Sequence, residues 1–119
     1  MNGRFTRQSR LTEIGARGQA AIEASDVHLG HGGVAGAVAA RYLAGAGVRR
    51  IHAHDAGAAR AAASVDASAV VTLDSDRAAE PLPAAFLLED PAARAVAEGA
   101  HDALVVLKAV LGIGPASRP

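Results

Sequence analysis

Short apolar runs alternate with longer helix-like stretches through the middle of the chain. Residues 26–29, 48–54 and 69–73 have the length and apolar content of strands, and the last of them suits a buried parallel strand. Residues 35–46 contain good helix formers with larger side chains at core-like spacing, and residues 58–64 form a shorter alanine-rich segment. Strands that alternate with helices in this way predict parallel β-α-β units.

Helix signals also mark the two ends of the chain. Residues 12–24 predict a short helix that its glycines weaken. Asp90 and Pro91 are a strong helix start, because a capping carboxylate precedes proline at the first helical position. We expect this last helix to end at Gly112. Residues 84–88 fit a short strand or a helical turn, and we assign them to a strand.

Together these elements predict an α/β, Rossmann-like three-layer fold with a short, mainly parallel sheet. A chain of 119 residues has the size of one domain with one core. We divide it into an N-terminal arm with a short helix (residues 1–25), a nucleotide-binding domain (residues 26–114) and a tail (residues 115–119).

The amino-acid composition excludes several classes of function. Lys plus Arg and Asp plus Glu are both 12, so the formal net charge is zero and nucleic acid is not an expected partner. The chain has no cysteine, which excludes disulfides, thiolate metal sites and a cysteine nucleophile. No apolar run has the length of a signal core or a membrane span, so we expect a cytoplasmic protein that does not enter membranes.

A glycine turn is the clearest functional motif. The segment that starts at Gly30 fits the dinucleotide-binding pattern G-x-G-x-x-G/A, with Gly32 at the position of phosphate approach and Ala35 at the position of close helix packing. The following helix offers free N–H groups and a positive dipole end to a phosphate. Asp55 lies twenty residues beyond Ala35, where a carboxylate can accept hydrogen bonds from ribose hydroxyls. We therefore predict nucleotide binding, with a merely structural tight turn as the alternative.

Several motifs in register resemble those of the ThiF/MoeB/HesA family, the bacterial relatives of ubiquitin-activating enzymes. The resemblance covers residues 4 to about 55 and includes Arg4-Phe5-Thr6-Arg7-Gln8, Glu13-Ile14-Gly15, Gly18-Gln19, Gly30-His31-Gly32-Gly33 and Ala44-Gly45-Ala46-Gly47-Val48. Residues 103–114 are similar to the late family helix that ends in Leu-Leu-Gly-Ile-Gly.

The resemblance implies an adenylyltransferase that uses ATP and Mg²⁺. Its substrate would be the C-terminal carboxylate of a small ubiquitin-like or sulfur-carrier protein, and it would act as a homodimer or as a heterodimer with a fuller family member. Carried over by position, Gly30, Gly32 and Gly33 would cradle ATP, and Asp55 would hold the ribose. Arg7 would contact the terminal phosphates of ATP bound to the partner subunit.

Beyond Asp55 the chain departs from the family pattern. The family's Asn-Leu-x-Arg-Gln segment and the lysine that follows it have no counterpart here, and the zinc-binding cysteine pairs are absent. Asp76 is the better match to the family's metal-binding aspartate, and Asp74 is the second. These losses predict impaired catalysis and suggest a catalytically dead relative that serves as a binding or dimerisation module. An NAD-binding oxidoreductase is a third hypothesis, because the turn and Asp55 suit either cofactor.

Four histidines lie on or beside the first two predicted strands: His28, His31, His52 and His54. The alternation of a strand puts His52 and His54 on one face, where a metal site is conceivable. With no cysteine and Asp55 as the nearby carboxylate, we interpret them as ordinary, partly buried histidines.

Overall fold

The computed structural model describes residues 15–83 and 89–112. It is an α/β structure with a small parallel sheet, as the sequence predicted. Residues 15–24 are helical, and the remaining elements follow in chain order: β1 (Asp26–His28), α2 (Gly33–Ala46), β2 (Arg50–His52), α3 (Ala56–Val65), β3 (Val70–Thr72) and α4 (Pro91–Leu111). The strand predicted over residues 84–88, the N-terminal arm and the tail lie outside the described residues.

The three strands pair in the order β1-β2-β3, and both pairings are parallel. Val27 lies opposite Ile51, which lies opposite Val71. Each strand covers three residues, fewer than the apolar runs predicted, because the ladder ends where the chain turns into the flanking loops.

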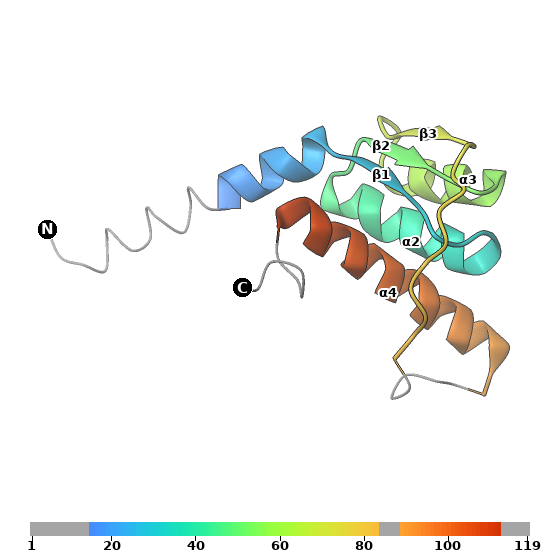
Figure 1. Cartoon of the computed structure of the whole chain (residues 1–119). Coiled ribbons are helices and arrows are strands. Elements are labelled where there is room, and N and C mark those ends of the chain that lie inside the picture. Colours follow the sequence, from blue (N-terminus) through green and yellow to red (C-terminus); the bar gives the residue numbers. More distant parts are fainter. Residues whose placement is uncertain (1–14, 84–88, 113–119) are drawn as a thin grey trace, which may run out of the picture.

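All described helices that cover the sheet lie on one of its faces (Figure 1). Successive right-handed crossovers that advance in one direction, from β1 to β2 to β3, place their helices on the same side. Val27 and Ile51 point to the helices and are buried, whereas Asp26 and His28 point the other way and are exposed. The described residues therefore form two layers, where the sequence predicted three.

Small side chains let the helices approach closely. The buried face of α2 consists of Ala35, Gly36, Ala39, Ala40, Leu43 and Ala44. Gly99 of α4 lies against this helix, since a Cβ built there would be 2.4 Å from the backbone oxygen of Ala35. Alanine and glycine thus contribute to the core mainly by permitting contact between helix backbones.

Both predicted ends of α4 and the predicted end of α2 are confirmed, whereas α2 begins at residue 33 instead of 35 and α3 covers residues 56–65 instead of 58–64. The Asp90 carboxylate accepts a hydrogen bond from the Ala93 N–H, and Pro91 is the first helical residue of α4. Gly47 and Gly112 adopt left-handed backbone conformations after α2 and α4, with φ of 107° and 73°. Within the described ranges, no helix has both the length and the apolar character needed to cross a membrane.

Candidate functional site

The glycine turn connects β1 to α2 at the carboxyl edge of the sheet, where ligands of open α/β sheets usually bind. Asp55 follows β2 at the same edge. Its Oδ2 accepts a hydrogen bond of 2.6 Å from the Gly33 N–H, and its Oδ1 accepts one of 3.1 Å from the Gly57 N–H. The structure thus brings together Asp55 and the turn, two features that the sequence placed in one site.

Asp55 is the N-cap of α3 and also binds the first residue of α2. The Gly33 N–H is the main reason that the pKa of Asp55 lies below its ordinary value, and the N–H groups of Ala58 and Gly57 act in the same direction. A carboxylate that accepts N–H bonds at two helix N-termini is stabilised in its charged form. Asp55 therefore stays ionised at neutral pH.

An open groove of about 570 Å³ lies beside Asp55. Its lining comes from the first turns of α2 and α3 and includes one cation, Arg60. The lining residues are Gly33, Val34, Ala37, Asp55, Ala56, Gly57 and Arg60. Gly32 is also close, since a Cβ built there would be 2.9 Å from the Asp55 Oδ2. The groove combines helix N-termini, a carboxylate and a guanidinium, which are groups that recognise phosphate and ribose.

Gly30 has a different environment from Gly32 and Gly33. Its N–H is donated to Asp102 of α4 at 2.9 Å, and a Cβ built on it would be 2.6 Å from the backbone nitrogen of Ala79. Glycine is required at position 30 because the backbone of Ala79 packs closely against it, and not because a phosphate approaches there. Gly36 is a further small residue that allows the turn to meet α2, because a Cβ at Gly36 would be 2.5 Å from the His31 oxygen. Ala35, the small residue that the sequence indicated, is buried in the same helix.

The loop after β3 crosses the carboxyl edge of the sheet. Ser75 donates its N–H to the Ala53 oxygen and its hydroxyl to the Leu29 oxygen. Further along, Ala79 donates its N–H to the Gly30 oxygen at 3.3 Å. Asp76 lies in this loop and is exposed, and within residues 15–83 and 89–112 its carboxylate makes no hydrogen bond or ion pair. A metal-binding role for Asp76 stays a prediction, and Arg7 lies outside the described residues.

An ion pair between the buried Asp102 and the partly buried Arg77 holds the turn, the loop and α4 together. The side chain of Asp102 is 1% exposed, and it accepts a hydrogen bond of 2.8 Å from Arg77 in addition to the one from Gly30. Arg77 also donates to the His28 oxygen at the end of β1. No local sequence pattern predicts this pair, because Asp102 lies in a helix with no motif around it.

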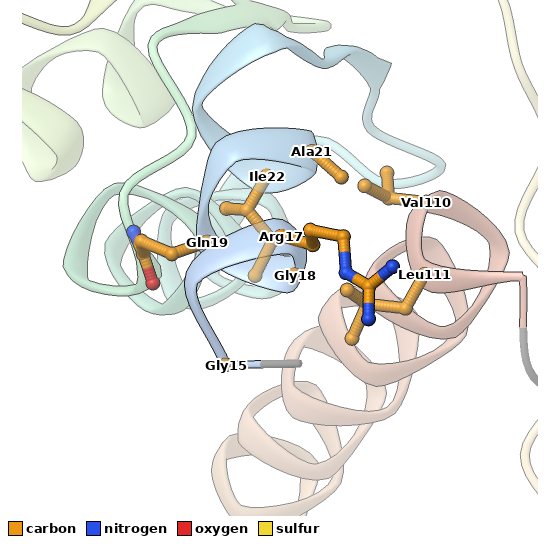
Figure 2. Close-up of a pocket in the computed structure, with 8 residues that line it drawn as sticks. All are labelled: Gly15, Arg17, Gly18, Gln19, Ala21, Ile22, Val110 and Leu111. Carbon is orange, nitrogen blue, oxygen red and sulfur yellow. The ribbon is translucent and has the colours of Figure 1, made fainter. Parts of the chain in front are cut away.

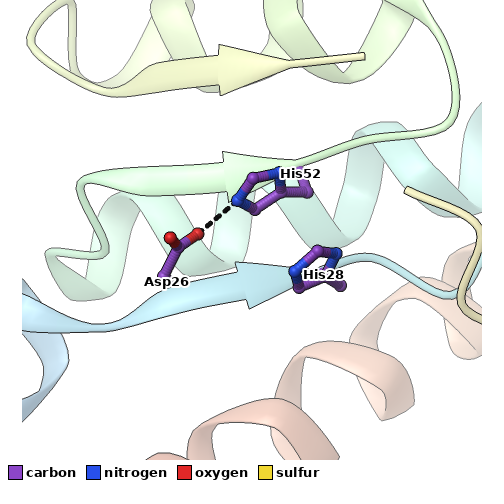
Figure 3. Close-up of side chains that lie close together, drawn as sticks. All are labelled: Asp26, His28 and His52. Carbon is purple, nitrogen blue, oxygen red and sulfur yellow. Dashed lines mark hydrogen bonds and ion pairs between the residues drawn. The ribbon is translucent and has the colours of Figure 1, made fainter. Parts of the chain in front are cut away.

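The open face of the sheet carries a second polar cluster. His52 Nδ1 lies 2.6 Å from Asp74, its Nε2 contacts Asp26, and its ring stacks on His28 with the centroids 4.1 Å apart (Figure 3). The hydrogen bond to Asp74 is the main cause that raises the pKa of His52. His54 does not share this face with His52, contrary to the strand alternation predicted there. β2 ends at His52, and His54 instead contacts the backbone oxygens of Leu29 and Arg77.

A further groove of about 610 Å³ separates the first helix from the end of α4 (Figure 2). Its lining is mostly apolar, with Ile22, Val110 and Leu111 among it, and Arg17 is the charged residue.

Comparisons of the chain with protein-family models, with curated proteins and with solved structures found no match.

Asp55 is expected to make stability depend on pH. Its pKa in the folded protein is lowered, so its contribution is fully present above its ordinary value of 3.8 and is lost as the pH falls through the folded value. Asp55→Asn keeps one acceptor oxygen but loses the charge and the second one, so it should lower the free energy of unfolding by about 1 kcal/mol at pH 7, and by progressively less below about pH 4. Urea unfolding of both proteins between pH 3 and 7 measures this difference.

Ser64→Ala is the control for this series. It removes a hydrogen bond of α3 to the Ala61 oxygen that involves no titrating group. Its effect should be the same at every pH, and an equally constant effect of Asp55→Asn would show that the carboxylate charge does not contribute.

Proposed function

We propose that this chain is a ThiF-type, Rossmann-like module that binds ATP at the glycine turn, with Asp55 as the ribose acceptor. The observation that carries the proposal is the contact between Asp55 and the start of α2 at the carboxyl edge of the sheet. The N–H groups that could bind phosphate and the carboxylate that could bind ribose thus belong to one groove.

The topology supports a Rossmann-like assignment. Parallel strands in the order β1-β2-β3, joined by α2 and α3, match the first half of that fold, and the glycine turn lies between the first strand and the first crossover helix. Gly33 has φ of 60°, a conformation that favours glycine and that leaves its Cβ position open toward the groove.

Asp55 can serve both the protein and a nucleotide. A carboxylate has about four acceptor positions, and the N–H groups of Gly33 and Gly57 use two of them. Ribose hydroxyls could donate to the remaining positions, or replace the Gly33 N–H when a phosphate takes it. Arg60 lies on the same groove and provides a positive charge for an anionic ligand.

From the resemblance, we propose that the bound ATP adenylates the C-terminal carboxylate of a small ubiquitin-like or sulfur-carrier protein. The carboxylate would attack the α-phosphate and pyrophosphate would leave, so the site needs cations beside the phosphates. Asp76 would bind the Mg²⁺ that provides one of these cations, because an exposed carboxylate oxygen is a ligand that Mg²⁺ prefers. Arg7 of a partner subunit would neutralise the departing pyrophosphate.

A binding module without turnover is the second candidate, and two observations favour it. The first concerns the catalytic groups: the loop of residues 73–83 is hydrogen-bonded across the carboxyl edge, and Lys108 does not line the groove beside Asp55. Lys108 is the chain's one lysine and lies in the last turn of α4, where Leu111 contacts the first helix. Among the described residues, moreover, one face of the parallel sheet has no covering layer, whereas such sheets are usually covered on both faces. A fuller family member or a second copy could occupy that face.

Calorimetric titration with ATP and Mg²⁺ tests the ATP-binding proposal. We expect saturable binding that Asp55→Asn weakens about 10- to 100-fold, because hydrogen bonds to a charged acceptor are worth about 1.5–3 kcal/mol. The matched variant is Asp66→Asn. Asp66 also accepts hydrogen bonds in a local turn, from Ser68, but it does not line the groove, so this variant should bind ATP as the native protein does.

The other results of this titration separate the hypotheses. Tighter ATP binding by Asp55→Asn would mean that Asp55 competes with phosphate for the Gly33 N–H, and the ribose role would be wrong. Preference for NAD would support the oxidoreductase, and binding of neither nucleotide would refute the proposal. If ATP binds, Mg²⁺-dependent ATP–pyrophosphate exchange with a carrier protein ending in Gly-Gly distinguishes an adenylyltransferase from a binding module.

A further inference from the structure

Three potential metal ligands meet on the open face of the sheet, away from the glycine turn. Asp26 and His28 are two residues apart in β1, so they share a face, and His28 lies directly opposite His52 in the parallel register. One ligand atom from each of the three side chains lies within 4.8 Å of the others (Figure 3). Strand pairing thus holds the three side chains together.

We propose that Asp26, His28 and His52 bind a divalent transition-metal ion of the zinc class. A tetrahedral ion at about 2.0–2.2 Å from each ligand would need donor atoms about 3.3–3.5 Å apart. The three donor atoms already lie within 4.8 Å. To admit the ion, Asp26, which is about half exposed, must move away from the His52 Nε2 that it contacts, and the stacked rings of His28 and His52 must tilt so that their lone pairs converge. Three protein ligands leave a fourth position open for water or another ligand.

His52 is already oriented for this role. Its Nδ1 is hydrogen-bonded to Asp74 at 2.6 Å, which directs Nε2 toward Asp26. Histidine ligands of metal ions usually have their second nitrogen bound to a carboxylate or a carbonyl, which fixes the ring and increases the basicity of the ligating nitrogen. Asp74 is therefore a positioning residue for the metal site.

His28 supplies a nitrogen that the described part of the protein does not use. Its ring stacks on His52 at an interplanar angle of 6°, and within residues 15–83 and 89–112 neither ring nitrogen makes a hydrogen bond. Two imidazoles with one carboxylate favour zinc and similar ions over Mg²⁺ and Ca²⁺, which prefer oxygen ligands alone. The site is thus chemically distinct from the Mg²⁺ that the adenylation proposal requires.

Metal titration of the full chain tests the site. After treatment with EDTA and dialysis, the native protein should bind one Zn²⁺ per chain in calorimetry, and Co²⁺ should give the visible absorption of a low-coordinate ion. His28→Gln and His52→Gln should abolish saturable binding. Asp74→Asn should weaken it about 10- to 100-fold, because that is the usual cost of losing the carboxylate behind a histidine ligand.

The matched control is His101→Gln, because His101 lies in α4 on the helical side of the sheet. It should bind Zn²⁺ with native affinity, and thermal unfolding in EDTA checks that each variant is folded. His28→Gln is the decisive variant, since the His28 ring has no hydrogen bond among the described residues to lose. Absence of saturable binding to the native protein, or native binding by His28→Gln, would overturn the proposal. Either result would leave ATP binding at the glycine turn untouched.

Discussion

Replacing Asp102 by alanine should lower the free energy of unfolding by about 3 kcal/mol, the lower end of the usual cost of removing one partner from a buried ion pair, because Arg77 is 28% exposed. The side chain is 1% exposed and accepts hydrogen bonds from Arg77 and from the Gly30 N–H. The variant leaves the Gly30 N–H without its acceptor, removes one of the two acceptors of Arg77 and opens a cavity between α4 and the glycine turn. Equilibrium urea unfolding measures the change.

Two further variants separate the effect of charge from that of hydrogen bonding at this position. Asp102→Asn keeps the volume and can still accept from Gly30, so it should cost less than alanine. Asp90→Ala removes another carboxylate of the same helix, the exposed N-cap of α4, and should cost about 1 kcal/mol. Equal effects of Asp102→Ala and Asp90→Ala would show that the pair does not hold the turn to α4.

Replacing Gly30 by alanine should destabilise the protein by about 1–3 kcal/mol and displace the loop of residues 73–83. The added Cβ would be 2.4 Å from the Ala79 Cβ and 2.6 Å from its backbone nitrogen, so backbone must move. Gly30 does not have a positive φ, so the effect measures packing and not backbone strain. Chemical denaturation gives the energy, and amide exchange of the loop reports the displacement.

Gly45→Ala is the matched control for Gly30→Ala. A Cβ at Gly45 would be 3.7 Å from the nearest atom, a Val65 methyl group, which is ordinary contact. Because Gly45 lies inside α2, alanine should stabilise the protein there by about 0.5–1 kcal/mol. If both variants changed stability in the same direction and by similar amounts, close approach of the loop to the turn would not be the reason for glycine at position 30.

The candidate nucleotide site was predicted in part. The pattern from Gly30 to Asp55 predicted one site, and the structure brings Gly32, Gly33 and Asp55 together. It also shows that Gly30 packs against Ala79, a contact that no local sequence pattern predicts. His28 and His52 were noted from the sequence but interpreted as ordinary histidines, and Asp26 was not recognised as their neighbour, because His52 meets Asp26 and His28 only through strand pairing.

The sequence by itself determined the alternation of strands and helices over residues 26–73, the end of α2 and both ends of α4. Asp90 with Pro91, and the glycines after α2 and α4, act on backbone groups within a few residues, so they can be recognised without knowing the fold. Only the tertiary structure decided which face of the sheet is covered and which polar groups meet there. Asp102 binds Gly30 across 72 residues of chain, and His52 binds Asp26 across 26, because strand order and helix packing, not local preference, set those distances.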